Sequence, residues 1–541
     1  MTFILEKLHD RASISPFAIG GLGLIVAFAF GLFINIYKKS GAPESRTKGH
    51  GFPLPPGPEP MPVIGNLLDI PRKHEWQTLT KWSAKYGDIV RVTVLGRVII
   101  FVNTMKAAND LFDKRSAIYS DRPRLPLLNE VRVFTGQFGT GNVKKFDIVQ
   151  EQASGKLLKR LLVNPENFID HLRLHAGQVI MMSVYGINVE SRLDGYITTA
   201  QKVMDAVSEA GRPGAFLVDI FPISWFPGTI SKDIIKQWRI DIHNLRWKPY
   251  AASVEILAEG GSPGPSFVSA LLEKSDGDCD KTEMDVLIRD SAALAYGGLP
   301  PISLSDPNLL MRPYAPLPTF FSSSLTIAGA DTSVATLTAF ILAMTIYPEV
   351  RKNAQAEIDA VVGASRLPSF SDRKNLPYLT AVMKETMRWH TTAPQALPHL
   401  LKEDDVYNGY FLPAGSIIVG NTWGILHDPA VYPDPMTFKP ERFLTAEGEI
   451  DDTLTDPVKY TFGYGRRICA GLNFAENTLW ITMAFILSTL DITLAKDAAG
   501  NPIPAALDPS SGLISHPDPF KCSVTARSAQ AEALIHQADV F

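Results

Sequence analysis

Hydrophobic residues follow two different spacings along this chain. Between residues 89 and 102, β-branched residues alternate and then run together around Gly96 and Arg97, a pattern that predicts a β-hairpin. From residue 107 onward apolar residues recur every three or four positions, the spacing of helices with a buried face. The segments expected to be helical are 76–86, 157–162, 168–185, 197–207 and 334–347. The pattern therefore predicts a mainly α fold with a small β-sheet region.

An uncharged, mainly apolar run covers residues 17–37, close to the N-terminus. Its length matches the roughly 20 residues that a helix needs to cross a membrane. Basic residues follow it at positions 38, 39, 46 and 48, and this bias predicts that the rest of the chain lies in the cytosol. A cleaved signal peptide is the alternative, but the run is long and no small-residue cleavage site follows it. We therefore expect an uncleaved, single-pass transmembrane anchor over residues 1–40.

A linker rich in proline and glycine follows over residues 41–62, with prolines at 53, 55, 56, 58, 60 and 62. Proline fixes φ and favours extended backbone, so this segment is expected to be a stiff spacer between the membrane and the body of the protein. No fixed-period repeat is visible, which argues against a solenoid. Residues 63–541 are expected to form the catalytic domain.

The composition limits the class of protein. The chain has 541 residues, of which 45% are hydrophobic and 20% charged, as expected for a globular chain with one large core or two domains. A net charge of −4 argues against a nucleic-acid-binding surface. Three scattered cysteines are too few for a disulfide framework or a zinc site made by protein alone, which favours a reducing compartment.

The candidate chemistry is concentrated in residues 462–471, where Cys469 follows an arginine pair in a glycine-lined turn. Positive charge, oriented backbone N–H groups and a metal all favour the thiolate form of cysteine. Gly465 and Gly471 would let the backbone approach a flat cofactor, and Phe462 could shield the sulfur from water. These features predict that Cys469 is a metal ligand; the alternative is a buried structural cysteine.

This loop fits the pattern F-x-x-G-x-R-x-C-x-G and resembles the haem-binding loop of cytochrome P450 monooxygenases. The resemblance implies a P450 fold containing haem b, with Cys469 as the axial iron ligand. It also implies that the cofactor-binding residues are Phe462, Gly465, Arg467, Cys469 and Gly471. Electrons would come from NADPH through NADPH–cytochrome P450 reductase, and the protein would lie in the endoplasmic reticulum membrane. Within the family, the chain looks most like fungal microsomal members resembling O-methylsterigmatocystin oxidoreductase.

A second motif, at residues 328–333, precedes the apolar helical run that proline ends at residue 348. It is similar to the oxygen-activating part of the long central helix of this family. The resemblance implies that Asp331 and Thr332 are catalytic residues that deliver protons during oxygen activation. An ordinary helix N-cap is the alternative, because Asp and Thr are favoured at helix starts.

Two further motifs agree with the resemblance. Glu385 and Arg388 stand three residues apart on a predicted helix, and the family joins such a pair to an arginine in a P-E-R-F segment, here Arg442. We expect these three residues to be structural and buried beneath the haem, although a surface ion pair is the usual meaning of this spacing. His399 lies where the family presents a side chain to a haem propionate; a surface-loop histidine is the alternative.

Two features depart from the family. A W-x-x-x-R helix that normally grips a haem propionate is missing, since no tryptophan occurs between Trp82 and Trp225. Residues 297–327 carry six prolines between positions 300 and 318 and interrupt what would otherwise be one helix. Because a proline in a helix interior costs about 3 kcal/mol, this insertion is expected to loop out. A retained intron or an altered exon boundary is our hypothesis, and a genuine extra loop is the alternative.

The leading interpretation is a membrane-anchored haem-thiolate monooxygenase that oxidises a small hydrophobic organic molecule with O₂, in fungal secondary or xenobiotic metabolism. An isomerase or dehydratase that uses no O₂ shares the cysteine loop but commonly lacks the acid–alcohol pair. A catalytically impaired scaffold protein is a third possibility, motivated by the two departures. The expected substrate-facing segments, 123–142 and 210–228, contain no charged cluster that identifies a ligand.

Overall fold

The computed structural model describes residues 51–121, 143–210, 232–261, 266–273, 285–293 and 329–538, apart from positions 63, 72, 95, 192, 193 and 287. The expected membrane anchor and the first half of the linker lie outside these residues. So do the insertion at 297–327, the substrate-facing segment 123–142 and nearly all of 210–228.

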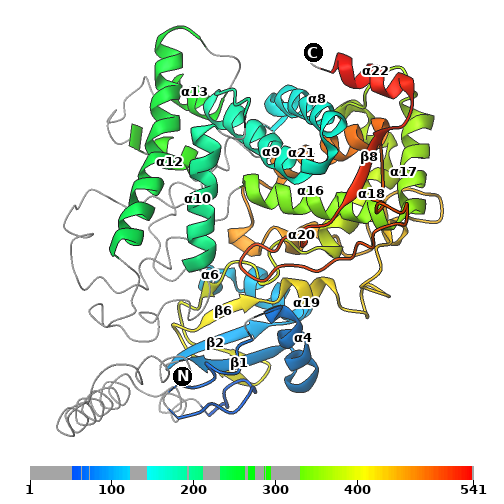
Figure 1. Cartoon of the computed structure of the whole chain (residues 1–541). Coiled ribbons are helices and arrows are strands. Elements are labelled where there is room, and N and C mark those ends of the chain that lie inside the picture. Colours follow the sequence, from blue (N-terminus) through cyan, green and yellow to red (C-terminus); the bar gives the residue numbers. More distant parts are fainter. Residues whose placement is uncertain are drawn as a thin grey trace, which may run out of the picture.

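A small β-sheet region occupies one end of the molecule, shown at the bottom of Figure 1. The hairpin consists of β1 (Ile89–Val94) and β2 (Arg97–Val102), paired antiparallel, as the sequence predicted. The sheet is completed by β6 (Ile417–Gly420), which runs parallel to β2, and by β3 (His399–Leu400), which pairs antiparallel with β6. Helix α4 (Glu75–Tyr86) packs beside this sheet through Leu79. Strands from distant parts of the chain therefore meet here.

Most of the remaining structure is helical. The longer helices are α8 (Asp147–Val163), α9 (Phe168–Tyr185), α10 (Gly195–Ala210), α12 (Lys232–Ala258), α16 (Gly329–Ile346), α17 (Pro348–Val361), α18 (Pro377–Trp389), α21 (Leu472–Thr489) and α22 (Ala529–Gln537). Shorter helical turns are α5 (Met105–Ala108), η1 (Asn109–Lys114), α6 (Ser116–Tyr119), η2 (Val143–Phe146), η3 (Pro165–Asn167), α13 (Phe267–Leu272), η5 (Phe370–Asn375), α19 (Thr422–Leu426), η6 (Pro440–Phe443), α20 (Val458–Thr461) and η7 (Gly465–Arg467). Two-stranded sheets are formed by β4 (Asp405–Tyr407) with β5 (Tyr410–Leu412), and by β7 (Leu490–Leu494) with β8 (Cys522–Ala526). The mainly α prediction is confirmed.

Helix α16 runs through the middle of the helical region, between α9, α18 and α21 (Figure 1). Its residues from Ser333 to Thr345 are buried on all sides, which explains why the sequence is apolar without an amphipathic stripe. Pro348 ends this run as predicted and is also the first residue of α17, where its missing N–H costs nothing. Within the described residues, α16 is the one helix with the length and composition to cross a membrane, and it is mostly buried inside the protein.

Candidate active site

The cysteine loop is a tight turn between α20 and α21. The Cys469 backbone N–H donates to the Phe462 carbonyl at 2.8 Å and closes the turn. Inside it, Gly463 and Gly465 have φ of 89° and 53°, which L-residues with side chains adopt reluctantly. A Cβ on Gly465 would lie 2.1 Å from the carbonyl oxygen of Phe112, so glycine is required there for a second reason. The turn thus presses against η1, far away in the sequence, and presents Cys469 just before α21 begins.

The Cys469 side chain is accessible by surface area, yet surrounding protein atoms desolvate it and raise the pKa of its thiol. A hydrogen bond from the Gly471 backbone opposes the rise in pKa. The Arg467 guanidinium donates to the Ser120 carbonyl, and its positive charge stays on the cysteine loop. Deprotonation would therefore depend on a bound metal.

Polar groups gather beside the loop, at the end of α6. The Arg467 Nε donates to the Ser120 carbonyl at 2.8 Å, and Nδ1 of His399 lies 2.6 Å from the Tyr119 carbonyl. His399 is only 2% exposed, which excludes the surface-loop alternative. The Ser120 hydroxyl is buried and has no hydrogen-bond partner among the described residues. An unsatisfied buried donor beside a cationic side chain fits an anionic group such as a haem propionate.

An aromatic stack packs against the polar cluster through the ring of His399. The rings of Phe112 and Tyr464 are stacked with centroids 4.6 Å apart, and the His399 ring lies 4.7 Å from Phe112. The Tyr464 hydroxyl is 2.7 Å from Thr422 Oγ1, and its ring occupies the space that a Cβ on Gly420 would need. The cysteine loop is therefore locked to both η1 and the small sheet.

The acid–alcohol motif lies in the first turn of α16. Asp331 forms a hydrogen bond with His516 from the C-terminal segment, at 3.2 Å between Oδ2 and Nε2. The Thr332 carbonyl accepts from Thr336 Oγ1 at 3.0 Å, an ordinary interaction within a helix. A Cβ placed on Gly329 would lie 3.3 Å from Cδ1 of Ile180 in α9, so glycine allows the two helices to pack closely here. Ala330, between them, packs against the same two cores that contain residues of α21. Phe462 of the cysteine loop packs against the first of these two cores, so the motif and the loop contact the same core.

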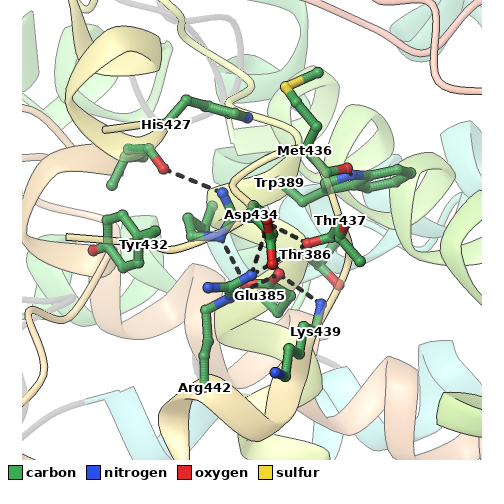
Figure 2. A network of polar contacts seen from close by, with 12 residues as sticks. Glu385, Thr386, Trp389, His427, Tyr432, Asp434, Met436, Thr437, Lys439 and Arg442 are labelled. Carbon is green, nitrogen blue, oxygen red and sulfur yellow. Dashed lines mark hydrogen bonds and ion pairs between the residues drawn. The ribbon is translucent and has the colours of Figure 1, made fainter. Parts of the chain in front are cut away.

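The predicted charge triad is brought together in the interior (Figure 2). Arg388 donates twice to Glu385, at 2.7 and 2.9 Å, and Arg442 Nε lies 3.2 Å from Glu385 Oε1. Glu385 and Arg388 are fully buried and Arg442 is 7% exposed. The Lys439 backbone N–H also donates to Glu385, at 2.8 Å. This geometry differs from the surface ion pair that the spacing alone would suggest.

Two arginines and one glutamate leave a net positive charge, which backbone carbonyls disperse. Arg388 donates to the carbonyls of Leu426 and Thr437, and Arg442 donates to that of Pro433. Burial, together with the charge of Arg388, lowers the pKa of nearby His427 to about 3, so this imidazole is neutral. A buried charge cluster of this kind is tolerated because its hydrogen bonds are satisfied.

Comparison with known proteins decides the family. The sequence profile described as Cytochrome P450 matches residues 55–144 and 321–524 of this chain. This chain belongs to the cytochrome P450 family. A cytochrome P450 monooxygenase of Armillaria gallica is 38% identical over 90% of this chain and 94% of its own length. Cytochrome P450 monooxygenase 98 of Postia placenta is also 38% identical, over 90% of this chain and 92% of its own length.

A solved zebrafish cytochrome P450, titled as a complex with abiraterone, superposes with a TM-score of 0.62 and 22% identity. It covers 84% of this chain, and this likeness concerns the fold alone. The chain is thus a P450-type monooxygenase, as the resemblance implied, and its fungal relatives match it over nearly their whole length.

Sequence reasoning missed Phe112, Tyr464, Ser120 and His516. Each lies within or beside a recognised motif or short helix, but its partner is tens to hundreds of residues away. The double glycine around Tyr464 was the only local signal of a close backbone approach.

Replacing Gly465 with alanine should disrupt the loop, because the new Cβ clashes with the Phe112 carbonyl and φ is unfavourable. Backbone strain of this kind costs about 1–3 kcal/mol, so haem binding should weaken by at least about fivefold. Haem titration into the apoprotein measures this. Gly195→Ala is the control, since a Cβ there meets open space. Equal haem affinity of the two variants would contradict the proposed role of the Gly465 contact.

Proposed function

We propose that this P450 is a membrane-anchored haem-thiolate monooxygenase that oxidises a small hydrophobic organic substrate, with Cys469 as the axial iron ligand. The observation that carries the ligand assignment is an accessible thiol, the one exposed cysteine among the described residues, in a turn whose backbone is fixed by contacts with Phe462 and Phe112. A soft thiolate is a suitable ligand for haem iron.

The remaining cofactor-binding residues would each have a separate role. Phe462 would shield the sulfur, while Gly465 and Gly471 would allow the backbone to approach the ring. Arg467 and His399 would bind propionates beside Ser120, which would offset the loss of the W-x-x-x-R helix. Haem b bound here would supply activation of O₂ and transfer of one oxygen atom to the substrate, the other atom leaving as water with two electrons from NADPH and two protons.

The protons would come from the first turn of α16. Asp331 is partly exposed and lies beside Thr332, so a carboxyl group and a hydroxyl group can relay protons from solvent. The enclosed core around α16 would exclude bulk water from the rest of the site. Glu385, Arg388 and Arg442 would have a structural role, holding the segment that leads to the cysteine loop.

The location and partners follow from the N-terminal sequence and the family. Residues 1–40 would anchor the protein in the endoplasmic reticulum membrane, and residues 41–62 would space the cytosolic domain from it. NADPH–cytochrome P450 reductase would supply electrons. The relatives of this chain in Armillaria gallica and Postia placenta are fungal P450 monooxygenases, which supports a fungal role for this chain. That role would lie in secondary or xenobiotic metabolism.

The proline-rich insertion at 297–327 would interrupt the central helix of the family. The nearest described residues on each side, 288–293 and α16, are helical, and Ile288 and Ala292 are buried in the core. A retained intron would explain a proline-rich sequence placed between two helical sequence patterns that would otherwise be continuous. Transcript sequencing decides this: the insertion in every mature transcript would exclude the intron.

Replacing Cys469 with serine should abolish the red-shifted carbon monoxide difference band of the reduced protein, because a serine oxygen is a harder, poorer ligand for haem iron. Cys522→Ser is the matched control: this thiol lies on β8, and burial raises its pKa to about 12. A thiolate band that survives in the Cys469 variant would refute the ligand assignment. A normal band in the intact protein without O₂-dependent turnover of any substrate would favour an isomerase.

Deleting residues 1–40 should release the protein from membranes on alkaline extraction while haem binding persists. The anchor precedes the domain that contains the cysteine loop, so its loss leaves the core unchanged. Membrane fractionation and the carbon monoxide spectrum check both parts. Undiminished resistance of the shortened protein to alkaline extraction would contradict a single anchor.

A further inference from the structure

The C-terminal segment between β7 and β8 reaches back to the start of α16. His516, from this segment, places Nε2 3.2 Å from Oδ2 of Asp331, although the two residues are 185 positions apart. The side chains are 30% and 18% exposed, respectively, so the pair lies at the border between core and solvent. An acid that relays protons needs such a position, because it must contact both water and the site.

The segment that carries His516 is held in one conformation by its own backbone. The His516 backbone N–H donates to Ser510 Oγ at 3.0 Å, and its carbonyl accepts from the Ser510 N–H at 2.8 Å. Pro509 and Pro517 form a bridge just outside this pair. The backbone therefore forms a closed turn, and the imidazole projects from it toward Asp331.

The same turn is fixed to the body of the protein next to α16. The Ser515 N–H donates to the Thr392 carbonyl at 2.8 Å, and the ring Nε2 of buried His390 lies 2.9 Å from the Ser515 carbonyl. Thr392 Oγ1 is in turn 3.1 Å from Thr336 Oγ1 of α16. Ile514 packs against Ala335, one helical turn after Asp331. These contacts hold the turn that carries His516 against α16, so that His516 and Asp331 face each other.

We propose that His516 is a positioning residue that holds the Asp331 carboxylate in its proton-relaying orientation. The inference rests on the proposed role of Asp331 in proton delivery. The hydrogen bond selects one rotamer of the Asp331 side chain, which would otherwise rotate toward solvent. Losing the bond lowers the fraction of time that the carboxylate is oriented for proton relay with Thr332. His516 itself need not touch substrate or cofactor.

The contact is tested first without turnover, by hydrogen–deuterium exchange of the haem-loaded protein. Asp331→Ala and His516→Ala each remove the hydrogen bond between the two side chains and should accelerate amide exchange in residues 509–517 by about two- to fivefold, the range expected for one partly exposed hydrogen bond. The double variant should exchange no faster than the single variants. His536→Ala, at an exposed position of α22, is the matched control and should leave the exchange in this segment unchanged. Wild-type exchange in both single variants would overturn the inference.

The consequence is tested by NADPH consumption in membranes that contain the reductase, which requires no knowledge of the substrate. Asp331→Asn should slow consumption at least tenfold, within the range for removal of a general acid. His516→Ala should slow it by about two- to fivefold, the same factor by which the oriented fraction of Asp331 falls. The double variant should be no slower than Asp331→Asn, and His516→Gln, which keeps an N–H donor, should recover most of the rate.

The outcomes separate the two proposals. A slow Asp331→Asn with a normal His516→Ala would overturn the positioning role and leave the role of Asp331 intact. A normal rate for Asp331→Asn would refute the proton-delivery role on which the inference rests.

Discussion

A buried carboxylate bound by two arginines is the interaction on which the architecture around the cysteine depends. Glu385 accepts from Arg388 on its own helix, from Arg442 in η6 and from the Lys439 backbone, so one side chain ties α18 to a segment that lacks long helices or strands of its own. Removing such charges from water costs several kcal/mol per ion, and the cost is met by multiple hydrogen bonds rather than by the ion pair alone. The cluster thereby specifies where an otherwise irregular segment lies.

The effect extends from this cluster to the site. The segment held by Glu385 continues to Tyr432 and Phe443, which belong to the same core as Tyr464 of the cysteine loop. On its other side the loop meets Phe112 so closely that no side chain fits at residue 465. Cys469 is therefore placed from two sides, by the segment that the charge cluster holds and by the aromatic stack, and these two supports meet at Tyr464. Helix α16 approaches through the core that contains residues of α21. Monooxygenase chemistry requires this fixed relation between ligand and proton donors.

The sequence predicted those features that depend on local pattern. The 168–185 helix has the bounds of α9, and the hairpin turns at Gly96 as expected, because both follow directly from apolar spacing. Helix α8 is longer than its predicted 157–162 core, since its first turns bury Gln150 and Ser154 and expose Ile148, so they carry no hydrophobic periodicity. The resemblance located the motifs, yet it could not provide the Gly465–Phe112 contact or the His516–Asp331 pair, which join distant parts of the chain. It also gave no sign that Arg467 donates to the carbonyl of Ser120, 347 residues earlier in the chain.

The central claim, that the buried charge cluster positions the cysteine loop, is tested most directly by Glu385→Gln, which keeps the shape of the side chain and removes its charge. Glu349→Gln is the control, because Glu349 pairs with Lys352 three residues away on α17 but is exposed. Breaking the buried cluster leaves two arginines without their counter-ion and should cost about 3–5 kcal/mol. Thermal unfolding and the reduced carbon monoxide spectrum of the haem-loaded variants are the measurements. The account predicts a lower unfolding temperature and a loss of the thiolate band in Glu385→Gln alone; a stable variant with an intact band would contradict it.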